Sequence, residues 1–204
     1  MTDKIHLDID GPIATITNDN TDKHNAFDDE MDARLFAIFD ELIATPSVRA
    51  VIWRGEGKSW SSGRDVAAIG NNVTELTHHE LMTRATRASE DLGARGPDRI
   101  VAIQGWAIGG SFQRASCATS ASRPTTPGSC CPVGHGVIPD TGGMGVLYEM
   151  CGHGLVSDMV LTGRRLSAEE ALAHGIVSRI VDRDELDATA REMAEKMLGA
   201  RRSR

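Results

Sequence analysis

Short apolar strands alternate with helical segments along this chain, and this alternation restricts the fold more than any other feature of the sequence. Strands are predicted over 5–9, 13–17, 48–53, 100–103 and 176–181, with a further short strand near Trp60. Helices are predicted over 28–44, 74–92, 169–174 and 184–198, from Ser111 onward and after the glycine-rich loop 139–145. Such alternation is typical of an α/β fold, and 204 residues are enough for one domain.

Composition excludes several classes of protein. The net charge of −7 and an aromatic content of 4% argue against a protein that binds mainly nucleic acid. No apolar run approaches the roughly 18 residues of a membrane span, and the acidic start is unlike a secretory signal, so the cytoplasm is the expected location. The cysteines show no metal-ligand spacing and are expected as free thiols; they are Cys117, Cys130, Cys131 and Cys151.

Residues 115–132 do not fit this pattern. The segment reads ASCATSASRPTTPGSCCP, without Leu, Ile, Val or Phe, although it lies where the core should continue. One interpretation is an exposed loop, but a structureless loop of this length is unusual in a compact domain. The other is a pair of compensating frameshifts, because shifting GC-rich codons by one nucleotide can yield a strand-like apolar pattern. The nucleotide sequence of the gene decides between them.

Two glycine-containing loops are the strongest candidates for function. The first glycine loop covers 59–66 (SWSSGRDV) and the second covers 103–110 (IQGWAIGG). Each follows a short strand and contains small residues that let a ligand approach the backbone closely. Two amides from separate loops can converge on one carbonyl oxygen and form an oxyanion hole.

Together with three further motifs, these loops resemble the crotonase (enoyl-CoA hydratase/isomerase) family. The further motifs are 22–27 (DKHNAF), 136–143 (GVIPDTGG) and 161–171 (LTGRRLSAEEA) followed by 175–178 (GIVS). The resemblance covers roughly 4–114 and 133–198. It implies a spiral of ββα-type turns, assembled as a homotrimer or a pair of trimers. It also implies an enzyme of fatty acid metabolism that hydrates or isomerises an enoyl-CoA, with coenzyme A as part of the substrate and no other cofactor or metal.

The resemblance also assigns binding roles to individual residues. The backbone amides of Arg64 and Gly110 would hold the thioester oxygen, while the Arg64 side chain is expected to be a solvated surface charge. The CoA moiety would pass five residues of two motifs, which are His24, Ala26, Ser62, Asp65 and Val66.

The acid and base positions depart from the hydratase pattern. Gln113 and Pro132 stand where hydratases of the family carry glutamates, and neither side chain exchanges protons near neutral pH. Asp140 matches an aspartate that isomerases and hydrolases of the family use, and it is equally a candidate helix N-cap. His135, close by in the sequence, is interpreted as a structural or exposed residue.

Two alternatives to an active enoyl-CoA hydratase or isomerase remain open. The first is a non-catalytic acyl-CoA-binding or assembly subunit, which the missing glutamates favour. The second is a serine hydrolase with the related Clp-protease fold and a triad of Ser111, His135 and Asp140. Residues 1–198 are predicted as the core domain and 199–204 as a basic tail. Family members usually continue with further helices, so a weakened trimer is expected.

Overall fold

The computed structural model describes residues 2–68, 80, 83, 96–116, 119–122, 128–129 and 143–200. Several predictions fall outside this part of the chain. They concern most of the predicted helix 74–92, the start of the glycine-rich loop at 139–142, and three cysteines, Cys117, Cys130 and Cys131. Cys151 is a free thiol, as expected.

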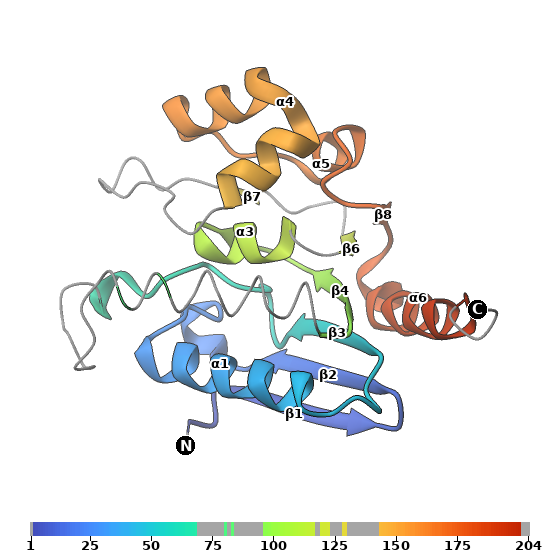
Figure 1. Cartoon of the computed structure of the whole chain (residues 1–204). Coiled ribbons are helices and arrows are strands. Elements are labelled where there is room, and N and C mark those ends of the chain that lie inside the picture. Colours follow the sequence, from blue (N-terminus) through green and yellow to red (C-terminus); the bar gives the residue numbers. More distant parts are fainter. Residues whose placement is uncertain are drawn as a thin grey trace.

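A sheet of six strands within the described residues forms the centre of the molecule (Figure 1). Its strands follow one another in chain order: β1 Ile5–Asp10, β2 Ile13–Asn18, β3 Ala50–Gly55, β4 Asp98–Ile103, β6 Thr119–Ser122 and β8 Arg179–Ile180. The β1–β2 hairpin is antiparallel and every later pairing is parallel. A separate small sheet pairs β5, Ala107–Ile108, with β7, Gly128–Ser129. The α/β class predicted from the alternation of elements is therefore what the chain forms.

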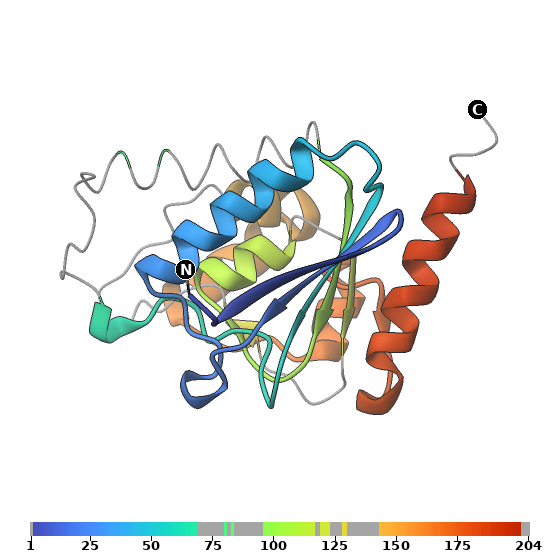
Figure 2. The same cartoon turned by 90° about the horizontal axis from the view of Figure 1, so that it is seen from below.

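Helices cover both faces of the large sheet (Figure 2). They are α1 Asp29–Ile43, α3 Gly110–Ser116, α4 Gly143–Thr162, α5 Ala168–Ala173 and α6 Leu186–Ala200, with short 3₁₀ helices at Thr21–Lys23, Val66–Ala68 and Arg183–Glu185. Successive side chains of a strand point to opposite faces, so the strands contribute side chains to two apolar clusters. The cluster shared with α1, α3 and α4 includes Ala14, Ile16, Val51, Trp53, Val101 and Ile103. The cluster shared with α6 includes Ile13, Ala50, Ile52, Ile100 and Ala102.

Three sequence predictions about elements need correction. Trp60 lies in no strand; it is fully buried beside a single bridge between Ser61 and Ala107. Only Arg179–Ile180 of the predicted strand 176–181 pairs with a neighbour. Part of the atypical segment is not a loop, since β6 lies between β4 and β8 in the large sheet. Backbone pairing joins β6 to both neighbours, which its residue types did not indicate.

The N-terminus of α1 is capped by Asp28, and this cap makes stability depend on pH. The Asp28 carboxylate accepts hydrogen bonds from the Met31 amide and from the Lys4 ammonium. Burial alone would raise the pKa of Asp28, but these two hydrogen bonds, together with the positive charges of Lys4 and Arg64, outweigh it and hold the pKa below its ordinary value of 3.8.

Acidification should therefore weaken the fold through Asp28. A carboxyl whose pKa is lowered by folding stabilises the protein above its ordinary pKa, and this stabilisation is lost as the pH falls through the lower folded value. We expect Asp28→Asn to have a lower Tm than the wild type at pH 7. When the pH is lowered to about 3, the Tm of the variant should fall less than the Tm of the wild type. Thermal unfolding at both pH values checks this. Parallel loss of Tm in the two proteins would contradict it.

Candidate functional site

The two glycine loops lie side by side and are joined by backbone hydrogen bonds. The amide of Trp60 donates to the carbonyl of Gln104 over 2.6 Å, and the amide of Ser61 donates to the carbonyl of Trp106 over 2.9 Å. The amide of Ile108 donates back to the carbonyl of Ser61 over 3.2 Å. The parallel neighbours β3 and β4 run toward the same edge of the sheet and bring the two loops together there.

Two glycines allow the loops to approach this closely. Gly105 has a φ of +58°, and an added Cβ would lie 1.9 Å from the carbonyl oxygen of Lys58. Gly63 has a φ of +90°, and an added Cβ would lie 2.6 Å from the carbonyl oxygen of Ile108. Both the backbone conformation and the space exclude any side chain, so the glycines in these motifs are needed for packing between the loops.

The first loop is also anchored in the apolar core. Trp53 of β3 donates its indole N–H to the Asn18 side chain over 2.9 Å, and the amide group of Asn18 donates to the carbonyl of Trp60 over 3.0 Å. The Asn25 side chain donates to the carbonyl of Ser59 over 2.7 Å. These buried polar contacts hold the backbone of the loop on a rigid support.

Arg64 and Gly110 each present a backbone amide for which the described residues supply no backbone acceptor. Phe27 pairs with the loop on either side of Arg64, donating to the carbonyl of Gly63 and accepting from the amide of Asp65, each over 2.8 Å. The N–H of Arg64 therefore points away from Phe27. Gly110 is the first residue of α3, where backbone amides have no partner within their own helix.

The two amides flank the junction of the loops. Arg64 follows Gly63, which approaches Ile108 two residues before Gly110. An added Cβ at Gly110 would meet no atom of the described residues within 4 Å. Two N–H groups that converge on one oxygen atom can stabilise negative charge that develops on it. The structure thus brings together the two segments that carry the amides of Arg64 and Gly110.

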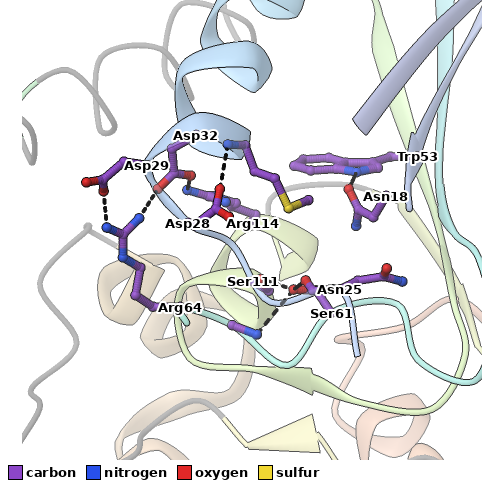
Figure 3. A network of polar contacts seen from close by, with 12 residues as sticks. Asn18, Asn25, Asp28, Asp29, Asp32, Trp53, Ser61, Arg64, Ser111 and Arg114 are labelled. Carbon is purple, nitrogen blue, oxygen red and sulfur yellow. Dashed lines mark hydrogen bonds and ion pairs between the residues drawn. The ribbon is translucent and has the colours of Figure 1, made fainter. Parts of the chain in front are cut away.

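A pair of buried hydroxyl groups supports this junction (Figure 3). The Ser61 hydroxyl donates to the carbonyl of Asn25 over 2.7 Å and accepts from the amide of Gly63 over 3.2 Å. The Ser111 hydroxyl lies 2.7 Å from it. Because the single proton of Ser61 is used for Asn25, Ser111 is the donor in this contact. The residue next to Gly110 is therefore linked to the first loop.

Three of the residues expected to line the path of the CoA moiety lie together. The amide of Ser62 donates to the carbonyl of His24 over 2.9 Å, and the His24 ring lies 3.0 Å from the Ser59 hydroxyl through Nδ1. Ala26, two residues after His24, is buried. The first family motif and the first glycine loop are therefore adjacent in space.

The other two residues of that group lie further along the first loop. Asp65 binds the ammonium of Lys23 over 2.7 Å, and this hydrogen bond holds the pKa of the carboxyl below its ordinary value. Val66 is 67% exposed, which is high for an apolar side chain. Lys23 was not singled out in the sequence, although it lies within the first family motif.

The side chain of Arg64 is not the solvated surface charge expected from the sequence. Its guanidinium binds the carboxylates of Asp29 and Asp32 in the first turn of α1, and only 31% of the side chain is exposed (Figure 3). Arg114 of α3 binds the same Asp32 over 2.8 Å. Sequence reasoning missed this cluster. A usable signal was Asp32 itself, a charged residue among the buried positions of an amphipathic helix.

The candidate acid and base positions are only partly described. Gln113 is 4% exposed and lies three residues after Gly110 on α3, where the resemblance places it. Pro132, His135 and Asp140 lie outside the described residues, so the role of Asp140 stays a prediction. Ser111, the nucleophile of the hydrolase alternative, is buried and its hydroxyl is bound to Ser61.

Neither a membrane span nor a metal centre is present in the described part of the chain. No helix there is long and apolar enough to cross a membrane. No group of three His, Cys, Asp or Glu side chains among those residues is arranged to hold a metal ion.

Comparison with known proteins gives consistent matches over nearly the whole chain. Residues 8–203 match the family model described as enoyl-CoA hydratase/isomerase. The carnitinyl-CoA dehydratase of Salmonella enteritidis is 32% identical over 207 residues, which span 98% of this chain and 76% of the relative. The structure of Pseudomonas aeruginosa DspI is 26% identical with a TM-score of 0.85, covering 97% of this chain and 75% of that one. An enoyl-CoA hydratase from Bacillus anthracis, 24% identical, is similar in fold with a TM-score of 0.86 over 96% of this chain and 76% of that one.

Proposed function

The chain belongs to the enoyl-CoA hydratase/isomerase family, and on that premise we propose that it binds an acyl-CoA thioester through the backbone amides of Arg64 and Gly110. The family expected from the sequence is confirmed, as is its α/β crotonase fold. The relatives support an enzyme of the hydratase/isomerase type. The proposal adds how the thioester is held and which groups act on it.

The proposed chemistry is stabilisation of an enolate. When a proton leaves the α-carbon of a thioester, or water adds to the β-carbon of its enoyl form, negative charge collects on the thioester oxygen. Two fixed N–H donors bind that charge more strongly than the neutral carbonyl, which lowers the barrier. The observation that carries this proposal is the pair of amides at the loop junction for which the described residues supply no backbone acceptor.

The CoA moiety is proposed to lie along His24, Ala26 and Ser62 and to continue past Asp65 and Val66. Support comes from the contact of these two segments and from the exposure of Val66, whose apolar side chain could cover the pantetheine chain. The free face of the Lys23 ammonium, on the same surface, would suit a phosphate oxygen of the substrate.

Proton transfer is the part of the mechanism in which this chain differs from hydratases. Gln113 can orient a water molecule or the substrate through its amide, but it cannot act as an acid or base at neutral pH. Asp140 is retained as the proposed proton-transfer group. Gln113 also favours a second candidate function, a protein that binds acyl-CoA and turns it over slowly or not at all.

Binding of two matched CoA derivatives tests the proposed site. Butyryl-CoA and S-butyl-CoA differ only in the thioester oxygen that the two amides would hold. We expect butyryl-CoA to bind about tenfold more tightly, because the thioether leaves both donors without their acceptor. Isothermal titration calorimetry measures both affinities, with free CoA as the reference. Equal affinities for the thioester and the thioether would rule out the proposed contact.

Turnover of the same protein sample separates the two candidate functions. Hydration of crotonyl-CoA, or isomerisation of a dienoyl-CoA, supports the enzyme. Tight binding of both substrates without turnover supports the acyl-CoA-binding protein. The two assays are independent, so a negative turnover assay leaves the binding result intact.

Assembly and location stay proposals. We propose a homotrimer or a pair of trimers in the cytoplasm, and the exposed apolar side chains of α4 and α5 are candidates for contacts between subunits. They are Tyr148, Met150, Leu161 and Leu172. Native mass spectrometry of the sample used for binding gives the number of subunits.

A further inference from the structure

The carboxylate of Asp32 is shared between two arginines from different parts of the chain. Asp32 lies in the first turn of α1 and is 9% exposed. Its Oδ2 accepts from Nη1 of Arg64 over 2.9 Å, and its Oδ1 accepts from Nη2 of Arg114 over 2.8 Å. Each carboxylate oxygen of Asp32 therefore accepts a hydrogen bond from one arginine. The side chains of Arg64, Asp32 and Arg114 form a continuous bridge (Figure 3).

The two arginines belong to the two segments that carry the proposed oxyanion amides. Arg64 supplies one of those amides from its own backbone. Arg114 lies on α3, the short helix that begins with the other amide donor, Gly110. A movement of the first loop relative to α3 would break at least one of the two contacts with Asp32. The bridge is therefore placed to control the distance between the two donors.

Two further contacts make the bridge stiff. The guanidinium of Arg114 lies over the ring of Phe27, 4.7 Å from its centroid. The backbone of Phe27 is hydrogen-bonded to the residues on either side of Arg64. Phe27 is therefore in contact with Arg114 through its ring and with the Arg64 segment through its backbone. Asp29 binds only Arg64 among the described residues. It balances the second positive charge without joining the two segments.

We propose that Asp32 is a positioning residue, whose carboxylate sets the relative placement of the Arg64 and Gly110 amides and thereby their ability to polarise the thioester oxygen. This inference rests on the proposed function, in which those amides hold that oxygen. Partly buried ion pairs contribute little net stability in many proteins, so stability alone is a weak reason for such an arrangement.

The test measures polarisation of the bound thioester and needs no turnover. A CoA ester of an aryl-enoic acid absorbs light through the conjugated system that includes the thioester carbonyl, and hydrogen bonds to this oxygen shift its absorption to longer wavelength. Asp32→Asn removes the bridging charge with little change in shape. Asp29→Asn is the matched control, since it removes a neighbouring carboxylate that binds Arg64 but does not touch Arg114.

We expect the wild type and Asp29→Asn to show the same red shift on binding the ester. Asp32→Asn should lose most of that shift, while its Kd for the ester stays close to that of Asp29→Asn. Arg114→Gln breaks the other arm of the bridge and should lose the shift as well. If circular dichroism shows that Asp32→Asn does not fold, the red shift of Arg114→Gln tests the positioning role in its place.

The contrary outcomes are distinct. A full red shift in Asp32→Asn or Arg114→Gln, or equal loss in Asp29→Asn, overturns the positioning role and leaves the oxyanion hole in place. Absence of any shift in the wild type, with the ester bound, overturns the proposed function instead.

Discussion

Replacing Gly110 with proline is expected to lower kcat/KM for an enoyl-CoA by about 10²–10³-fold, the loss typical of removing one oxyanion donor. Proline has no backbone N–H, yet it is well tolerated at the first position of a helix, which is where Gly110 lies. An added side chain there meets no atom of the described residues within 4 Å. The variant should therefore fold normally and lose one proposed donor.

Gly110→Ala is the matched control for this substitution. Alanine adds a Cβ at the same place but keeps the N–H, so it separates loss of the donor from occupation of the space. The preference for butyryl-CoA over S-butyl-CoA gives the same comparison without turnover, and it should fall in the proline variant only. If the two variants behave alike in both assays, the amide of Gly110 has no special role.

Gly105→Ala is expected to be the most destabilising of the substitutions considered, by about 3 kcal/mol. An alanine with the φ of +58° observed for Gly105 costs about 1–2 kcal/mol. Its Cβ would lie 1.9 Å from the backbone oxygen of Lys58, and crowding of this kind adds about 1–3 kcal/mol because backbone must move. Urea denaturation at 25 °C gives the free energy of unfolding.

Gly11→Ala isolates the contribution of the contact between the loops. Gly11 lies in the β1–β2 turn with a φ of +59°, almost the same as Gly105, but an added Cβ there would meet no atom of the described residues within 4 Å. Only the conformational cost, about 1–2 kcal/mol, is expected for this variant. A similar loss of stability in both variants would show that the loops can separate without cost. The close approach on which the proposed site depends would then be in doubt.

Much of the scaffold was predictable because it depends on local signals. The helix predicted over 28–44 is observed as α1, because its cap at Asp28 and its apolar stripe are set by hydrogen bonds and spacing within a few residues. The helix predicted over 184–198 is observed as α6 for the same reason, since its buried residues Leu186, Ala190 and Met193 recur at helical intervals. The errors occurred where pairing partners are distant. Trp60 is apolar and buried but lies in no strand, since only a single bridge at Ser61 follows it, and β6 is a strand although its residues show no apolar alternation.

Sequence alone determined the family, the α/β class and the two loops whose backbone carries the proposed chemistry, because glycines with small neighbours are recognisable as a motif. Only the tertiary structure decided what the charged side chains around those loops do. From the sequence alone, Arg64 is expected to be a surface charge. Its guanidinium pairs with carboxylates only because the first turn of α1 and the helix α3 are packed beside it. Asp29 and Asp32 are more than 30 positions from Arg64, and Arg114 is 82 positions from Asp32. No local pattern reports such a contact, since an ion pair depends on separations in space that the packing of the whole domain sets.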